Sequence, residues 1–534
     1  MQTDVRTQND LKLRWEYLDG LKKPILALAE EYSQWTLPYV FPATGSENVE
    51  LQLSKDSIGA QAVNHLANKV VSVLFPPQRM FFRLHVSEEM KQMAEAALSQ
   101  AGAPSVEDAK HQVSKAMVAV ESALSSAEKK AQDYLDMVQY RPQAVNAAKL
   151  LIITGNALEY HPEGRPVQIY NLRDYCVVRD LSGEPIEFMT KESKTFETFH
   201  PDIQVQLRAL GLGPKHKQEY TDKSEVTIYT QIKLEEDGKF HIYQAGDNIA
   251  LDTDGAFYTK DELPWIALTW NLVRGEDYGR GLVADYAGAF HAVNVLSGSL
   301  LNLAAIMGDI KFLVSPTSLV DVPALNRAAP GTYHAGKEGD VTAIQLNKVS
   351  DAQFISAMIE RYERQIAQAF LLNSALTRDA ERVTAEEIRA QANELETSNG
   401  GIYSRLAGTW QVQLANIVLK QTNFEGLNMG IIPQIVTGMD SLSRAGELDN
   451  LRMFFADLGM LNAVPEDIRM ALDVPALIGV IGTNRQVDYQ KFTKTAQQMQ
   501  AEQDAAIQQQ QQLEQQASNR DAQVAASKEA MKGS

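Results

Sequence analysis

The sequence is poor in the residues that disulfide bonding, metal binding and catalysis require. A single cysteine, Cys176, occurs among 534 residues, so no disulfide can form within the chain, and the composition is typical of a protein that folds in a reducing cytoplasm. The nine histidines never lie three to five residues apart, which excludes a common local zinc motif. Neither the phosphate-binding pattern GxxxxGKS/T nor the hydrolase pattern GxSxG occurs. We therefore predict no metal, no cofactor and no enzymatic activity.

The closest approach to a glycine-rich phosphate loop is RGEDYGRG at 274–281. Its spacing fits no phosphate-binding motif, so we interpret it as a turn that joins a strand to a helix. Acidic pairs such as Glu235-Glu236 and Glu386-Glu387 are interpreted as solvated surface or as charges at helix N-termini, rather than as metal ligands.

Basic residues are fewer than acidic ones, 50 against 68, which gives a net charge of 50 − 68 = −18. This balance argues against a protein that grips nucleic acid over a broad surface. It is compatible with a surface that nucleic acid passes without binding. The first twenty residues are polar and charged, so the sequence predicts no secretory signal peptide.

One long stretch, Tyr286 to Gly308, has no Asp, Glu, Lys or Arg in 23 residues. That length would permit a membrane span. Polar residues such as His291, Asn294 and Asn302 are scattered through it, however, and no other segment resembles it. We therefore favour a helix that packs closely against other protein, and we predict no membrane association.

The periodicity of the apolar residues predicts an α+β protein that is mainly α. Helical patterns come first, and from residue 157 alternating patterns indicate a compact β-rich region. The predicted helices are 8–33, 57–74, 106–139 and 141–154, and the predicted strands are 167–172, 176–180, 185–192, 226–234, 240–244 and 266–273.

Two further helices, 284–308 and 352–372, flank about forty residues of irregular and short-strand character. The first helix is nearly uncharged. The second alternates Glu360, Arg361, Glu363 and Arg364 along a side that is typical of a face in contact with water. Residues 433–482 are predicted to be helical. The tail from 485 is rich in Gln, with 11 in the 20 residues from Gln497 to Gln516, and is predicted to be an extended helix in an assembly or disordered.

The segment TAEEIRAQANELETSNGGIYSRL (384–406) opens with a capping box, because Thr384 is followed three residues later by Glu387. Its apolar stripe keeps the helical period on both sides of Gly400-Gly401. We therefore predict one long helix over 384–423 with a kink at the two glycines. The alternative is a helix that ends in a C-cap, followed by a short turn and a second helix.

Five ordered segments together resemble the portal, or head-to-tail connector, proteins of T7-like short-tailed bacteriophages. They are LFPPQRMFFRLHVSEE (74–89), ITGNALEYHPEG (153–164), YCVVRDLSGEP (175–185), GEDYGRGLVADY (275–286) and LNSALTRDAERVTAEEIRAQANELETSNGGIYSRL (372–406). The resemblance runs from about residue 10 to 480. The Gln-rich tail departs from the family.

The resemblance implies the portal fold, with its wing, stem helices, clip, tunnel loop with long kinked helix, and helical crown. Carried over to this chain, the parts are wing 1–283, stem helices 284–308 and 352–372, clip 309–351, tunnel loop 373–383, kinked wing and crown helix 384–423, crown 424–484 and C-terminal tail 485–534, a helical barrel or disordered. The kink at Gly400 and Gly401 would turn the helix from the channel wall into the wing.

The resemblance also implies a function and partners. The chain would form a homo-oligomeric ring, usually a dodecamer, at one capsid vertex, where it is the conduit for DNA packaging and ejection. It would be made in the host bacterial cytoplasm and reside in the virion at the head–tail interface. The implied partners are the capsid protein, the scaffolding protein, the large subunit of the terminase, the tail adaptor and nozzle proteins, the internal core proteins, and double-stranded DNA that passes without sequence specificity.

Within that reading, the DNA channel and tunnel loop would include Thr377, Arg378, Asp379, Glu381 and Arg382. Arg378 and Arg382 would contact the DNA backbone transiently, or would pair with Asp379 and Glu381 inside the loop. Glu360, Arg361, Glu363 and Arg364 would be the channel-facing residues of the stem.

A non-viral oligomeric scaffold or a secretion-type ring is the alternative reading. Such a ring could use the same long helices and would also lack catalytic motifs, but it would not be expected to match five ordered portal segments. A nuclease or nucleotide hydrolase is weaker still, because its catalytic motifs are missing.

Overall fold

The computed structural model describes residues 8–43, 54–77, 80–85, 106–198, 201–209, 225–246, 249–251, 255–309, 311–318, 320–344, 348–372, 385–398, 401–422, 434–436 and 456–457. The chain divides into two compact units, Met1–Leu442 and Ser443–Ser534. Only 456–457 are described in the second unit, so the architecture that follows is that of the first.

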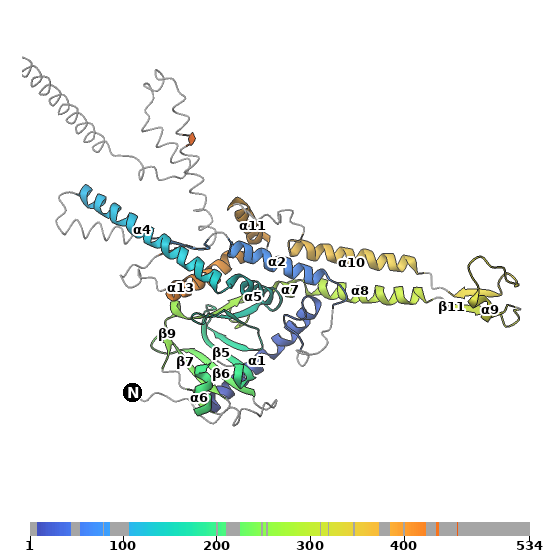
Figure 1. The fold of residues 1–534 in the computed structure, drawn as a ribbon, viewed down its shortest axis with the longest axis horizontal. Coiled ribbons are helices and arrows are strands. Elements are labelled where there is room, and N and C mark those ends of the chain that lie inside the picture. Colours follow the sequence, from blue (N-terminus) through green and yellow to red (C-terminus); the bar gives the residue numbers. More distant parts are fainter. Residues whose placement is uncertain are drawn as a thin grey trace, which may run out of the picture. The chain divides into compact units, whose positions relative to one another are not determined.

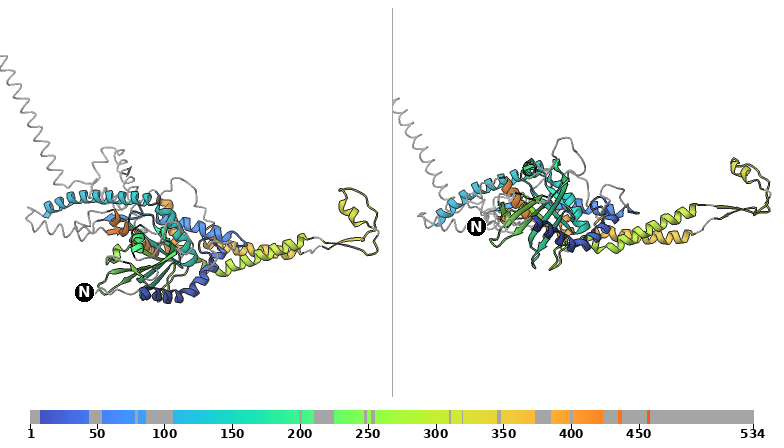
Figure 2. Two further views of the ribbon diagram at one scale, coloured as in Figure 1. Left: turned by 60° about the horizontal axis from the view of Figure 1, so that its bottom comes forward. Right: turned by 90° about the horizontal axis from the view of Figure 1, so that it is seen from below.

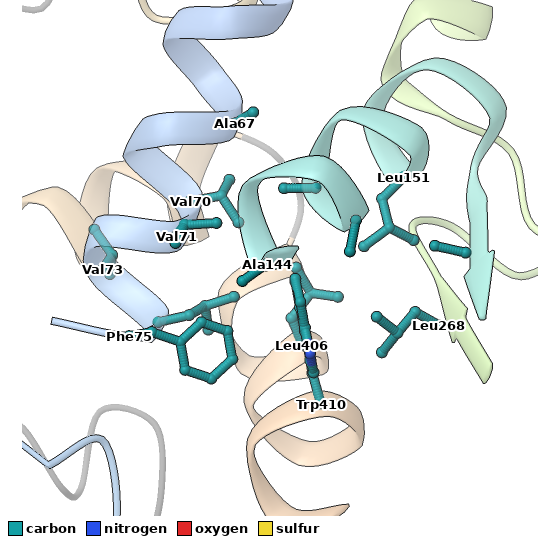
Figure 3. Close-up of a cluster of buried hydrophobic side chains, with 14 of the residues drawn as sticks. Ala67, Val70, Val71, Val73, Phe75, Ala144, Leu151, Leu268, Leu406 and Trp410 are labelled. Atoms are coloured by element: carbon teal, nitrogen blue, oxygen red, sulfur yellow. The ribbon is translucent and has the colours of Figure 1, made fainter. Parts of the chain in front are cut away.

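Among the described residues of the N-terminal part there are four long helices, and each begins and ends within two residues of its predicted range. They are α1 (Gln8–Trp35), α2 (Ile58–Leu74), α4 (Val106–Met137) and α5 (Tyr140–Thr154). Helices α2 and α5 pack against each other, with small and branched side chains such as Val70 and Ala144 at their contact, while Leu151 of α5 lies on the side of Leu268 (Figure 3). The ring of Phe75 lies 5.1 Å from that of Trp410, so this core also holds the C-terminal helices in place.

The β-rich region forms two antiparallel sheets, as its alternating pattern predicts. The larger sheet has the order β4-β5-β6-β7-β8, with β9 also paired to β7, and the smaller one has the order β10-β2-β3. Strand β2 was not predicted, because four consecutive residues of it are buried and the alternation that marks a half-exposed strand is absent. The strands are β2 (Asn156–Tyr160), β3 (Gln168–Tyr170), β4 (Tyr175–Arg179), β5 (Pro185–Thr195), β6 (Glu225–Leu234), β7 (Phe240–Gly246), β8 (Ile249–Leu251), β9 (Phe257–Tyr258) and β10 (Trp265–Thr269); the short helices η1 (Phe196–Thr198), α6 (Pro201–Ala209) and η2 (Lys260–Glu262) lie between them in sequence.

The two helices predicted around the irregular segment lie side by side (Figures 1 and 2). The first is divided at Tyr286 into α7 (Leu282–Asp285) and α8 (Ala287–Gly308), and the second is α10 (Val349–Ala369). The segment between them contains β11 (Lys311–Val314), α9 (Val322–Arg327) and β12 (Val341–Ile344), and the two strands pair antiparallel. The short-strand character expected of this segment is therefore confirmed by β11 and β12, whereas helix α9 was not predicted.

The single kinked helix predicted over 384–423 is wrong, and the alternative with two helices is correct. Helix α11 (Ala385–Ser398) ends before the glycines, and α12 (Ile402–Leu406) begins after them. Gly401 has φ 81° and ψ 20°, a left-handed conformation that ends a right-handed helix, and its N–H donates to the carbonyl of Glu396 at 2.9 Å. Gly400 and Thr384 lie outside the described residues.

Side-chain capping explains why a second helix begins so soon after the turn. The Glu396 carboxylate accepts the backbone N–H of Ser404 at 3.0 Å and its hydroxyl at 2.7 Å, close to the N-terminus of α12. A π-helical turn, η3 (Ala407–Gln411), then continues into α13 (Val412–Gln421). The apolar stripe stays in phase across the glycines because both helices pack on the same core, not because they are one helix.

The helical prediction for 433–482 is wrong at 434–436 and is confirmed at 456–457, the other two residues of this range that the structure describes. Gln434–Val436 forms strand β13, which pairs antiparallel with β1 (Arg83–His85). Its β-branched Ile435 and Val436 follow a proline, and both favour a strand once a partner strand is available. The rest of that range lies outside the described residues, apart from 456–457, as does the Gln-rich tail.

The turn at Gly401 generates a stability prediction. Gly401→Ala places a side chain at positive φ, so we expect the free energy of unfolding to fall by about 1–2 kcal/mol. Gly408→Ala is the matched control, because Gly408 lies in a helical turn and a methyl group there meets nothing within 4 Å. Denaturant unfolding of both variants measures the difference. Equal stability of the two variants would show that the left-handed turn is not required.

Candidate functional site

The α8–α10 pair is anchored in the core at one end only. Phe290 and Val293 of α8 are buried against Ile366 of α10 and Phe370 just beyond it. The rings of Phe290 and Phe370 meet edge to face, with centroids 5.5 Å apart. The pair is therefore fixed where Phe290 and Phe370 meet and extends away from that point (Figure 1).

A short turn before α2 braces the same end. The backbone N–H of Lys55 donates to Asn294 Oδ1 at 2.9 Å, and the Ser297 hydroxyl lies 3.5 Å from Asp56 Oδ2. Asp56 Oδ1 also accepts the N–H of Ile58 at 2.7 Å, at the point where α2 begins. Polar residues in the uncharged helix thus serve to orient α8 against α2.

Beyond its anchored end, α8 exposes apolar side chains. Val295, Leu301 and Ile306 are 50%, 59% and 57% exposed, and 17% of the most apolar window of the helix is buried. Among the described residues α8 is the one helix long and apolar enough to cross a membrane, which by itself is weak evidence for a span. Exposed apolar side chains gathered along one helix are typical of an interaction surface.

The four charged residues predicted for the wetted face of α10 do not all share one environment. Glu360, Arg361 and Arg364 are exposed, and Arg364 Nη2 lies 3.6 Å from Glu360 Oε2. Glu363 is half-buried on the side of α2, where burial raises the pKa of its carboxyl and neighbouring Asp56 raises it further. Three of the four residues therefore form the polar face, whereas Glu363 lies near Asp56, where the turn before α2 contacts α8.

The segment at the far end of the pair presents apolar residues to solvent. Phe312 and Leu313 are consecutive in β11, so their side chains point to opposite faces of the two-stranded sheet, and both are exposed. Tyr333 is fully exposed in the following loop. Asp321 caps α9 by accepting the N–H of Ala324 at 3.2 Å. The segment is thus locally ordered while its apolar side chains lack cover from the described residues of its own chain.

The predicted tunnel loop lies between two firmly held ends. Residues 373–384, including Thr377, Arg378, Asp379, Glu381 and Arg382, lie outside the described residues. Before them, Phe370 and Leu371 are buried, and Leu371 has φ 58°, an uncommon conformation for a bulky side chain. After them, α11 is tied to α2 by the ion pair of Lys69 Nζ with Glu394 Oε2 at 2.5 Å.

A buried polar network that sequence reasoning missed fastens the π-helical turn to the smaller sheet. The Trp410 indole N–H donates to Tyr140 Oη at 2.7 Å and lies 3.0 Å from Glu159 Oε2. Glu159 Oε2 is also 3.2 Å from the Tyr140 hydroxyl and 3.1 Å from His161 Nε2. Burial, followed by the charge of Glu159, raises the pKa of Tyr140 well above its ordinary value.

The signal for this network was present in the sequence but weak. Glu159 and His161 stand two residues apart, which places both on one face of a strand, and they lie in the segment 153–164. Their partners come from 140 and 410, and no local pattern predicts that pairing. Among the described residues no group of three or more His, Cys, Asp or Glu could hold a metal ion.

Trp410→Phe tests whether the network stabilises the fold. The change keeps an aromatic ring but leaves the buried Glu159 with one donor fewer, so we expect a loss of about 1–3 kcal/mol in the free energy of unfolding. Trp265→Phe is the control, because Trp265 is also buried and stacks on Tyr160 with centroids 4.5 Å apart. Thermal unfolding compares the two variants. If Trp410→Phe costs no more than Trp265→Phe, the indole hydrogen bonds contribute nothing beyond packing.

Comparison with known proteins covers nearly the whole chain. A family model described as "Bacteriophage head to tail connecting protein" matches residues 8–473. The portal protein of Enterobacteria phage SP6 is 33% identical over 458 residues, which is 86% of this chain and 85% of the relative. The portal protein of Enterobacteria phage T3 is 30% identical over 89% of this chain and 87% of its own length. That of Escherichia phage T7 is 29% identical over 92% and 91%.

The matched range includes the braced α8–α10 pair, the β11–β12 segment and the Gly401 turn. It also contains all five segments that carried the resemblance in sequence. The chain therefore belongs to the family of bacteriophage head-to-tail connecting proteins.

Proposed function

We propose that this chain is a portal protein that assembles into a ring, of about twelve copies, at one vertex of the capsid. The observation that carries the proposal is the uncharged, exposed part of α8 beyond its anchored end, with Val295, Leu301 and Ile306 open to solvent in the single chain. Burial between neighbouring copies would remove this apolar surface from water, at about 25 cal/mol per Å². The portal proteins of phages SP6, T3 and T7 support the assignment.

The parts of the portal map onto the elements as follows. Helices α8 and α10 are the stem, 309–351 is the clip, 373–383 is the tunnel loop, and the residues before 284 form the wing. Helices α11 to α13 join channel wall, wing and crown through the turn at Gly401, and 424–484 is the crown. In this arrangement the exposed Glu360, Arg361 and Arg364 line the channel side of the stem.

Passage of DNA in this proposal depends on weak interaction with the wall. A chain with a net charge of −18 repels phosphates, so a ring of such chains lets double-stranded DNA slide without capture. Arg378 and Arg382 in the tunnel loop supply transient backbone contacts that carry no sequence information. The mechanism requires no reaction in this chain, since the energy for packaging comes from the terminase.

The clip is the proposed docking surface for the large subunit of the terminase during packaging and for the tail adaptor and nozzle proteins afterwards. The exposed Phe312, Leu313 and Tyr333 support this role. The capsid protein, scaffolding protein and internal core proteins would contact other parts of the ring. In the virion the ring occupies the head–tail interface, and the chain is made in the host cytoplasm.

Ring assembly is tested by charging the outer face of α8. The double variant Leu301→Asp, Ile306→Asp should fold normally, because both side chains are exposed in the single chain, yet its ring yield should fall at least about tenfold. Arg361→Asp on the polar face of α10 is the control. Native mass spectrometry measures the ring fraction. A wild-type chain that remains monomeric at micromolar concentration would contradict the proposal.

The tunnel loop is tested separately from assembly. Arg378→Glu with Arg382→Glu should leave the ring yield unchanged and alter the amount of DNA packaged or retained per particle, because only the contacts with phosphates are reversed. Arg165→Glu with Arg274→Glu makes the same change of charge at two exposed residues of the wing. Identical DNA content in the two double variants would remove the proposed role of the loop arginines.

A further inference from the structure

Helix α1 carries two apolar stripes on neighbouring sides, roughly a third of a turn apart around the helix axis. Leu11, Trp15, Leu18 and Ala29 are buried against the sheet and the core. Leu13, Tyr17, Leu21 and Leu28 recur at helical spacing on the other side, where the first three are 61%, 60% and 61% exposed and Leu28 is 48% exposed. A surface helix needs one apolar face to pack against the core of its own chain, so packing in that core does not account for the second stripe.

The outer stripe continues along the helix to the end of α1 that meets α8. At 100° per residue, Tyr32 and Trp35 lie on the same side as Leu13 to Leu28, and both are half-buried. The Trp35 ring lies 5.6 Å from that of His291, an exposed residue of α8. His291, Val295 and Ile306 recur at helical spacing along the outer face of α8. The apolar surface of α1 is therefore continuous with the face proposed to be covered by a neighbouring stem.

We propose that the outer stripe of α1, Leu13 to Leu28, is the wing's part of the subunit–subunit interface and is covered by a second copy of this chain. The inference rests on the proposed ring. Continuity is the argument: a subunit that covers His291 and Val295 of α8 reaches the adjoining end of α1 as well. In a ring each contact is heterologous, so the stripe meets a different surface of the next copy.

Other occupants fit the stripe less well. A membrane-bound amphipathic helix places Lys and Arg beside its apolar face. Around this stripe Lys12 and Lys23 alternate with Glu16 and Glu31, and all four are exposed. Mixed charges of this kind are typical of the rim of a protein–protein contact.

The first experiment compares two double variants made with the same chemistry. Leu13→Gln with Leu21→Gln should lower the ring fraction at least about tenfold in native mass spectrometry while leaving thermal unfolding of the single chain unchanged. Leu181→Gln with Val205→Gln is the matched control, because these residues are more exposed still but lie outside α1. Loss of rings in the first variant alone supports the interface. Equal ring fractions in both variants overturn it.

The second experiment uses the buried cysteine. Because Cys176 is 0% exposed, Leu21→Cys adds the one accessible thiol. Maleimide labelling of Leu21→Cys should be at least about tenfold slower in the ring than in the monomer fraction of the same preparation. Leu181→Cys should label equally fast in both. Fast labelling of Leu21→Cys in the ring would show that the stripe faces solvent or a different partner.

The two proposals fail in distinguishable ways. If the wild-type chain forms no rings, the proposed function itself is wrong. If wild-type rings form and Leu13→Gln with Leu21→Gln assembles equally well, only the α1 interface is wrong. If that variant forms normal rings but the rings are not incorporated into capsids, the stripe binds the capsid protein. That result would overturn the proposal that a second copy of this chain covers it.

Discussion

The structure depends on helix α8, which is anchored in the core at one end and exposes apolar side chains to water towards its other end. Phe290 and Phe370 fix α8 and α10 in the core, and the Asn294 and Asp56 contacts orient them. Beyond that point α8 has no charged residue with which to face water, and Val295, Leu301 and Ile306 stay exposed although α10 lies beside the helix. Assembly resolves this conflict, since a neighbouring copy can cover the apolar face while the charged side of α10 stays hydrated.

The described residues on either side of 373–384 are held in the core. On one side the chain leaves the core at Leu371, and on the other it is fixed by the Lys69–Glu394 ion pair and the Gly401 turn. The Trp410 network then ties the following helices to the smaller sheet.

Much of the fold follows from the sequence, because apolar residues recur with a period of 3.6 residues in long helices and of two residues in half-exposed strands. The helices from Gln8 to Thr154 and the α8–α10 pair were predicted to within a few residues. Strand β2 was not, since burial on both faces removes its alternation. The SNGG segment was misinterpreted because phase continuity reflects a shared core as well as a continuous helix. Only the left-handed φ of Gly401 separates the two cases.

The candidate site was less predictable than the fold. The alternating charges of α10 indicated a wetted face, but Glu363 is half-buried beside Asp56, which is far away in sequence and helps to raise its pKa. The buried contacts of Glu159 with Trp410 likewise join residues 251 positions apart. Local patterns report which face is polar, whereas the partner of a buried polar group is decided by the tertiary fold.

Electron microscopy of the purified full-length chain tests the central claim most directly. The account predicts closed rings of about twelve copies with an axial hole, in which the outer face of α8 is buried between neighbouring subunits. A population of compact monomers, with α8 open to solvent at the same concentration, would contradict it.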